Sequence, residues 1–368
     1  MLLTHVVLLS VTAAALVAVA FAVLRRQAGG VAPALHAESL QVGAVIVSLI
    51  VISLLCLRSL AFGVDTVAYA ELFTHYCNGG RLADVESSFQ AATVLLNGMM
   101  LGACSTQLLP TAWILAIVLP VLALAAPWRL KLSYLAAFLL SMIGIELATN
   151  ALRQGLSVGF MLVAVSVLTT PAHKGRWLAL PFTLLAVVFH SSALLFFGAY
   201  VLARLRWLPF LGVTAALIWV TVNFLDADIA LPLASEFLYE IQKYAAHEDD
   251  ELWIRVLAFA TVLAALTAPW LARQPGPWLT AMIRGPYAVA LRLSLLCVPF
   301  LALPYFGYRF IYGVYPAILF LTLGASMLPG ATPVARASAQ VAWLLGMNVA
   351  VILAWSAGSS YMREVPFL

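Results

Sequence analysis

Charged residues are scarce in this chain: Asp, Glu, Lys and Arg together account for 9% of its 368 residues, whereas hydrophobic residues account for 64%. The mean hydropathy is +1.04. A soluble globular domain carries roughly 25% charged residues. The composition therefore excludes a water-soluble globular protein and predicts that a lipid bilayer is the solvent.

The sequence also lacks the motifs of nucleotide-driven and metal-dependent chemistry. It contains no Walker loop, no GxGxxG in a βαβ context, no HExxH, no GxSxG and no DxD pair placed as a nucleotide-sugar metal site. The four cysteines form no CxxC pair and have no metal-ligand spacing; they are Cys56, Cys77, Cys104 and Cys297. We interpret them as packing residues and expect no metal and no cofactor.

Long apolar runs are abundant, and each helix that crosses a bilayer needs about 20 such residues. Full crossings are predicted at 2–24, 40–57, 108–126, 132–149, 154–170, 207–225, 252–272, 286–304, 308–328 and 337–356. Two further apolar stretches, 86–104 and 177–203, contain polar residues or an interruption, so we expect broken or re-entrant segments there. The predicted fold is all-α: one integral membrane domain over residues 1–368, a polytopic bundle of about ten to twelve helices.

The basic residues predict which loops are cytoplasmic. They cluster at 25–26, 129–131, 174–176, 204–206, 273–284 and 336. With these loops inside, both termini and the loops 58–85 and 226–251 are periplasmic, provided that the two interrupted stretches return to the face they left. All but one of the 15 acidic residues, the exception being Glu38, then lie outside or near an outer helix end. Acidic residues contribute little to topology, so this asymmetry is an independent check.

Each of these two periplasmic loops is predicted to carry an amphipathic surface helix. Apolar residues recur at i, i+4 and i+7 in both loops, at Tyr69, Phe73 and Tyr76 in the first and at Phe237, Ile241 and Tyr244 in the second. Such a helix either lies in the headgroup layer or forms a lid over the bundle. The pattern favours neither alternative, because an apolar stripe shows orientation and not a ligand.

Charged and polar residues near the outer helix ends are the first candidates for function, because ionisable groups at bilayer depth are costly. Glu146, Asn150 and Arg153 recur at i, i+4 and i+7, and Gln154 follows on the adjoining edge. This spacing predicts a polar helical face that lines a cavity. The structural alternative is an ion pair between Glu146 and Arg153.

A second candidate is His190, which interrupts an apolar run and is followed by Ser191 and Ser192. Irregular backbone at membrane depth is tolerated only where it lines protein or water. A neutral imidazole in such a place can accept a proton. The alternative is a bundle histidine whose hydrogen bonds are satisfied by packing.

Arginines mark several other outer helix ends. Arg309 stands among tyrosines, and Arg255 and Arg58 have similar positions. Snorkelling arginines in an aromatic belt are one explanation. The guanidinium group is also the preferred partner of pyrophosphate, through bidentate charge-assisted hydrogen bonds. Arg292 lies near a cytoplasmic end, and we expect its side chain to snorkel.

Short pieces of the chain, in order over roughly residues 40–315, resemble the EpsG-type exopolysaccharide polymerases, which are related to the Wzy-type O-antigen polymerases. They are Arg58 with Gly63-Val64-Asp65 and Tyr69, Glu86-Ser87-Ser88-Phe89, Asn150 to Leu156 (NALRQGL), Phe189 to Leu194 (FHSSAL), Lys243-Tyr244, and Tyr308-Arg309-Phe310. The NxxRQG and FHSSAL pieces are the most specific. Family members often have proline after the loop glutamate, where this chain has Ser87.

The resemblance implies a glycosyltransferase of the bacterial inner membrane that polymerises a surface polysaccharide, O-antigen or exopolysaccharide. A glycan would move from undecaprenyl pyrophosphate onto the next lipid-linked repeat unit at the periplasmic face, without metal or nucleotide. A chain-length regulator protein is a possible partner, and nucleic acid is not. An O-antigen ligase, or a transporter or flippase of lipid-linked sugars, is the alternative function.

Two groups of residues are expected to carry this chemistry. The proton of the acceptor hydroxyl needs a base, for which we favour His190, with Asp65 and Glu86 as rivals. The pyrophosphate and sugars need binding groups, for which we expect Arg153 first, then Arg309 and Arg58, with further contributions from Gln154, Arg255, Asn150, Ser191 and Tyr244.

Overall fold

The computed structural model describes residues 45–46, 48–58, 64–80, 86–139, 141–149, 151–169, 175–224, 285–297 and 304–326. Every regular element in these ranges is helical, as the apolar runs predict. After a helical segment at 48–56, the elements are α3 (Val64–Cys77), α4 (Ser87–Met99), α5 (Leu109–Leu122), α6 (Trp128–Leu139), α7 (Met142–Thr149), α8 (Leu152–Thr169), the 3₁₀ turn η1 (Arg176–Leu178), α9 (Ala179–Phe189), α10 (Ala193–Ala203), α11 (Trp207–Phe224), α15 (Pro286–Leu295) and α16 (Pro304–Ser326).

Of the helices in the described ranges, α8 alone is both long and apolar enough to cross a membrane. Shorter apolar segments of 10–17 residues occur in α5, α9, α10, α11 and α16. The number of crossings therefore stays a prediction. The spans expected at 2–24, 252–272 and 337–356 and the loop 226–251 lie outside the described residues.

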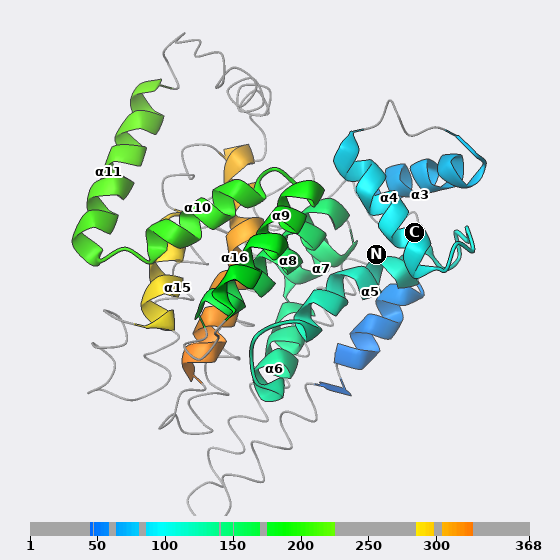
Figure 1. Ribbon diagram of the computed structural model, residues 1–368, viewed down its shortest axis with the longest axis horizontal. Helices are drawn as coiled ribbons and strands as arrows, with labels where there is room; N and C mark the ends of the chain where they lie inside the picture. The colour runs from blue at the N-terminus through cyan, green and yellow to red at the C-terminus, as the bar shows by residue number, and fades with distance from the viewer. Residues whose placement is uncertain are drawn as a thin grey trace, which may run out of the picture.

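Helix α8 lies at the centre of the bundle, in contact with α5, α7, α9, α10 and α16 (Figure 1). Gly155 near its start permits a close approach to two of these neighbours. A Cβ there would lie 2.6 Å from the Leu147 carbonyl oxygen of α7 and 2.6 Å from Ile117 Cδ1 of α5. The glycine of the NxxRQG piece is therefore required for helix packing at this position.

The segment before α8 is more broken than the sequence analysis expected. Two helices, α6 and α7, replace the single span predicted at 132–149, and α7 ends at Thr149 before α8 begins at Leu152. Ser141 contributes to the first break, because its Oγ accepts a hydrogen bond from the Gly144 amide at 3.1 Å, as an N-cap does. The polar face predicted from Glu146 to Arg153 is wrong as a continuous helical face.

The interrupted stretch 177–203 is two helices, as predicted. Helix α9 ends at Phe189, and His190 follows in an extended conformation with φ −160° and ψ 123°. Helix α10 begins at Ala193 and packs against α8, α15 and α16. Helix α9 packs against α8 and α4, with Phe189 stacked on Phe160 of α8 at 5.6 Å between ring centroids. The break at His190 therefore lies beside α8.

Helix α3, in the loop predicted at 58–85, packs against the bundle. Tyr69 and Phe73, two residues of its predicted apolar stripe, are 3% and 1% exposed. Tyr69 lies between Phe89 of α4 and Trp113 of α5, with ring centroids 4.9 and 5.0 Å away. The apolar stripe of α3 therefore packs on α4 and α5.

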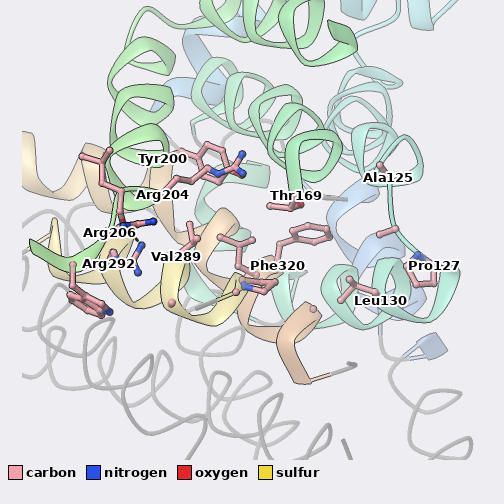
Figure 2. Close-up of a pocket in the computed structure, with 18 residues that line it drawn as sticks. Ala125, Pro127, Leu130, Thr169, Tyr200, Arg204, Arg206, Val289, Arg292 and Phe320 are labelled. Atoms are coloured by element: carbon pink, nitrogen blue, oxygen red, sulfur yellow. Dashed lines mark hydrogen bonds between the residues drawn. The ribbon is translucent and has the colours of Figure 1, made fainter. Parts of the chain in front are cut away.

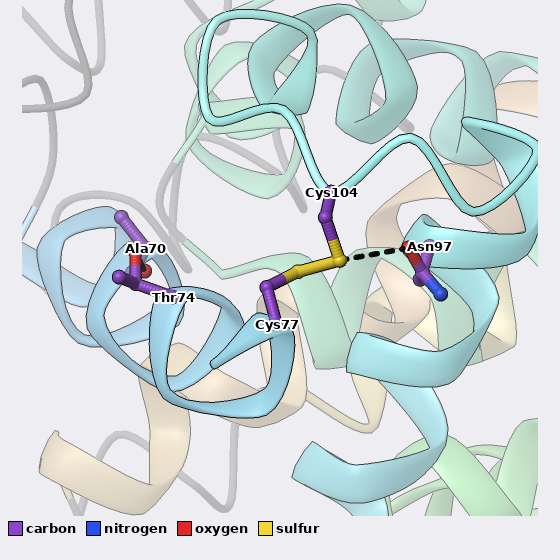
Figure 3. The surroundings of a disulfide bond; sticks show 5 residues. All are labelled: Ala70, Thr74, Cys77, Asn97 and Cys104. Atoms are coloured by element: carbon purple, nitrogen blue, oxygen red, sulfur yellow. Dashed lines mark hydrogen bonds between the residues drawn. A yellow bond between two sulfur atoms is a disulfide. The ribbon is translucent and has the colours of Figure 1, made fainter. Parts of the chain in front are cut away.

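One interpretation of the cysteines is wrong. Cys77 at the end of α3 and Cys104 in the turn after α4 form a disulfide across 27 residues of sequence (Figure 3). Cys56 and Cys297 are free, and Cys297 is buried as a packing residue should be. The spacing of the bonded pair follows no motif, so only the folded chain shows that α3 and the end of α4 meet.

Candidate functional site

Glu86, Ser88 and Arg153 form a compact polar cluster between the start of α4 and the start of α8. Arg153 Nη1 donates to Glu86 Oε2 at 2.7 Å and to Ser88 Oγ at 2.6 Å. The Ser88 hydroxyl in turn donates to Glu86 Oε1 at 2.7 Å. Two pieces of sequence 67 residues apart, both part of the family resemblance, thus meet through their charged side chains.

The partner of Arg153 corrects the sequence analysis, which offered Glu146. Because α7 ends before α8 begins, residues 146 and 153 do not share one helix, and Glu86 takes the place of the expected acid. Arg153 uses Nη1 for both contacts. In the described part of the chain Nη2 and Nε of Arg153 have no hydrogen-bond partner, and its side chain is 21% exposed. These N–H groups remain for an anionic ligand.

An aromatic ring holds the guanidinium of Arg153 in place. Arg153 Cζ lies 3.6 Å from the centroid of the Phe89 ring, close enough for a cation–π contact. Phe89 packs on Tyr69, Tyr69 packs on Trp113, and Trp113 faces the guanidinium of Arg58 at 5.0 Å. The row of rings fixes α3, α4 and α5 relative to the two arginines.

The cluster keeps Glu86 ionised. Burial alone would raise the pKa of this carboxyl. The hydrogen bond from Ser88, the hydrogen bond and charge of Arg153, and the charge that His190 carries when its ring is protonated together outweigh burial and lower the pKa below its usual value. The side chain is 63% exposed, so the carboxylate is accessible to a ligand.

His190 lies at the break between α9 and α10, and its charge when protonated helps to lower the pKa of the Glu86 carboxyl. The amide N–H of Ser192 donates to His190 Nδ1 at 3.3 Å, and Ser192 Oγ lies 2.7 Å from the same nitrogen. An amide can only donate, so Nδ1 is an acceptor and the neutral ring carries its proton on Nε2. The break thus sets the tautomer of the histidine, with Nδ1 as the acceptor.

Arg58, unlike Arg153, is buried and binds backbone carbonyls. It is 8% exposed, and its Nη1 and Nη2 donate to the carbonyls of Ala148 and Thr149 at 3.0 and 3.3 Å. Thr66 Oγ1 donates to the Thr149 carbonyl as well, at 2.6 Å. These groups cap the end of α7, where the helix dipole favours a cation. The cap holds the chain that leads into Arg153.

The remaining predicted site residues are less informative. Gln154 is buried and Ser191 is exposed beside His190. The backbones of Asp65 and Arg309 belong to α3 and α16, but their side chains lie outside what the structure describes. Asn150, Arg255 and Tyr244 lie wholly outside the described residues. No group of three or more His, Cys, Asp or Glu side chains able to hold a metal occurs among the described residues.

Sequence reasoning gave no role to Ser88 or Phe89, although both lie in a recognised piece. It offered Ser191 and Ser192 as residues that fix the tautomer of His190, and the structure shows Ser192 in contact with Nδ1. Ser88 bridges the ion pair, Phe89 supports the guanidinium, and Ser192 orients the imidazole. The spacing carries part of this signal, because a serine two residues from a glutamate or a histidine at a helix start can bond back to it. The role of Phe89 could not be predicted from the sequence, because its ring contacts Arg153 only when α8 packs beside α4.

Comparison with known proteins gives one match. A family model described as the EpsG family matches residues 43–327, which is most of the chain and includes every part of the cluster. No curated protein and no solved structure matches it. The chain therefore belongs to the EpsG family, a family of membrane proteins that polymerise exopolysaccharides.

Proposed function

We propose that the protein extends a surface polysaccharide at the periplasmic face of the bacterial inner membrane, using glycans carried on undecaprenyl pyrophosphate. A hydroxyl oxygen of the acceptor repeat unit attacks the anomeric carbon of the donor glycan. The bond between that carbon and the pyrophosphate oxygen breaks, and undecaprenyl pyrophosphate leaves. The hydroxyl proton passes to a base. A lipid bilayer and a chain-length regulator are the partners expected for such an enzyme.

The observation that carries this proposal is the contact of Glu86 and Ser88 with Arg153, two separate parts of the chain, with the His190 break at the end of α9, a helix that packs on α4. The pair supplies what the transfer needs: an ionised carboxylate and a guanidinium with N–H groups to spare. The donor is already activated, so stabilisation of the departing pyrophosphate and removal of one proton are the main tasks.

The geometry changes our assignment of the base. His190 Nδ1 accepts hydrogen bonds from Ser192, so the neutral ring offers Nε2–H and not a lone pair. We assign proton removal to Glu86, which is ionised, exposed and has lone pairs beyond those used by Ser88 and Arg153. For His190 we propose the second role that the sequence suggested, orienting the sugar. Asp65 remains the rival base.

Arg153 is the group we assign to the pyrophosphate. Its Nη1 is held by Glu86 and Ser88, and its plane is supported by Phe89, so Nη2 and Nε are pre-oriented as a donor pair. Arg58 has both Nη groups on backbone carbonyls, and for it we propose a supporting place behind the site.

The disulfide supports the periplasmic side. Disulfides persist in oxidising compartments such as the periplasm and are rare in the cytosol. The Cys77–Cys104 bond lies at the far ends of α3 and α4, the two helices that surround Glu86. It also agrees with the expectation that the stretch 86–104 returns to the face it left.

The test uses a host without its own polymerase, with glycan length scored on gels and protein amount scored by blot. Arg153→Lys and Glu86→Gln should abolish long glycan while protein accumulates normally. Arg176→Lys, at an exposed arginine in η1, is the matched control and should leave glycan length unchanged. Normal glycan from Arg153→Lys and Glu86→Gln would remove the cluster from the reaction. Purified protein that moves lipid-linked sugar without lengthening it would identify a transporter, and transfer to a lipid A core acceptor a ligase.

A further inference from the structure

A second site candidate lies far along the bundle from Glu86. A cavity of about 1160 Å³ opens between the end of α10, the start of α11, the turn before α6, α15 and α16 (Figure 2). The loops around it, at 125–130 and 204–207, carry basic residues of the kind that predict the cytoplasmic side. No motif of the family resemblance falls here.

One end of the cavity is cationic. Arg204, Arg206 and Arg292 lie on the same side in Figure 2. Arg204 and Arg206 are exposed, and Arg206 has no hydrogen-bond or ion-pair partner within the described ranges. None of the described residues that line the cavity is acidic. Positive charge gathered here is therefore not balanced by any described part of the lining, which favours an anion.

Arg292 gives this end a fixed framework. Instead of snorkelling, as the sequence suggested, it is 5% exposed and its Nη1 donates to the carbonyls of Ala203 and Leu205. Its guanidinium also lies 4.8 Å from the centroid of the Trp207 ring. These contacts close the end of α10 and set the turn that carries Arg204 and Arg206.

The opposite end of the cavity is apolar. Figure 2 places Ala125, Pro127 and Leu130 there, with Phe320 between that end and the arginines. A free phosphate or a small polar metabolite gains nothing from such a lining. A molecule with an anionic head and a hydrocarbon tail matches both ends.

The surface beside the arginines also favours a ligand with an anionic head and a hydrocarbon tail. Helix α11 begins at Trp207, directly after Arg206, and carries strongly exposed apolar residues: Leu208, Leu211 and Trp219 are 84%, 52% and 62% exposed. An apolar helix surface that follows a basic turn is typical of the boundary between headgroups and acyl chains.

We propose that this cavity binds an anionic phospholipid of the inner leaflet, with its phosphate on Arg204 and Arg206 and an acyl chain along the apolar end. This site is separate from the polymerisation site at Glu86 and does not take the lipid-linked substrate. It depends on the membrane location of the protein, not on the identity of the reaction.

The experiment measures lipid retained by the purified full-length protein in nanodiscs of phosphatidylcholine containing increasing phosphatidylglycerol, by native mass spectrometry after release. The double variant Arg204→Gln/Arg206→Gln should bind phosphatidylglycerol about tenfold or more weakly, because two cationic contacts are lost. Arg129→Gln/Arg176→Gln removes the same charge from exposed arginines that do not line the cavity, and should bind as the unmodified protein does.

A second variant keeps every arginine. Val289→Trp fills the cavity wall on α15 and should also weaken phosphatidylglycerol binding, with unchanged elution on gel filtration. Equal binding by all variants, or an equal loss in the Arg129/Arg176 control, would overturn the proposal. The proposal would also be overturned if glycerol phosphate, at the same concentration as the lipid, raised the melting temperature of the protein equally. A soluble phosphate would then be enough to fill the site, and no acyl chain would be needed. Glycan synthesis is measured separately, so failure of this site and failure of the polymerase assignment are distinguishable.

Discussion

Ser88 provides the sharpest test of the cluster, because its neighbour Ser87 offers a control of the same chemistry. Ser88 is 5% exposed, and its Oγ contacts both Glu86 Oε1 and Arg153 Nη1, at 2.7 and 2.6 Å. Ser87 occupies the adjacent position of the same helix turn but is exposed. Ser88→Ala therefore deletes two hydrogen bonds to charged groups, while Ser87→Ala deletes none that the structure describes.

The size of the effect follows from these contacts. A hydrogen bond to a charged group contributes about 1.5–3 kcal/mol when well buried. The Glu86 side chain is 63% exposed, so solvent screens much of this contribution. We take about 1.5 kcal/mol for the pair of bonds, which corresponds to a rate roughly tenfold lower if the transition state requires Glu86 and Arg153 to be held together.

The assay measures the initial rate of glycan extension by purified protein from a lipid-linked repeat unit, with thermal stability recorded in parallel. Ser88→Ala should lose about tenfold in rate. Ser87→Ala, and Ser87→Pro, which places proline at the first helical position, should stay within about twofold of the unmodified protein. A Ser88→Ala protein that is folded and as fast as Ser87→Ala would refute the idea that the hydroxyl positions the pair.

Three further predictions concern the rest of the structure. His190→Ala should lower the extension rate about 100-fold with normal protein in the membrane; a rate within a few-fold of normal would make it a packing residue. Cys77→Ala with Cys104→Ala should lower the free energy of unfolding by about 3.5 kcal/mol, the entropy of closing a 27-residue loop, and reductant should have no further effect on the melting temperature. Gly155→Ala should cost about 1–3 kcal/mol through overpacking, whereas Gly212→Ala, where a Cβ meets nothing within 4 Å, should not destabilise; equal melting temperatures would contradict the close approach.

The main parts of the site are readable from the sequence because each carries a local signal. His190 interrupts an apolar run, and Arg153 is a charge in a chain that has few. Breaks and charges are costly in a bilayer, so they are visible without knowledge of the fold. The broken stretch 177–203 and the candidate bases were predicted on this ground, and the structure brings Glu86, Arg153 and His190 together.

The partners of these residues are less readable, because they depend on where helices end. Helical spacing offered a shared polar face from Glu146 to Arg153, with an ion pair between them as the alternative, but the end of α7 at Thr149 destroys that register. The same helix end creates the free carbonyls that Arg58 caps. The contact of Arg58 with these carbonyls therefore depends on tertiary structure, and no spacing in the sequence predicts it.

The disulfide closes a covalent ring that contains some residues of the candidate site and not others. Glu86, Ser88 and Phe89 lie within the ring that the bond between Cys77 and Cys104 closes. Arg153 and His190 lie outside this ring, on the central helices. A displacement of Glu86 away from α8 lengthens its 2.7 Å contact with Arg153. Widening the site to admit a bulky glycan by this route would therefore separate the carboxylate from the guanidinium, and the pair would reform as the ring returned.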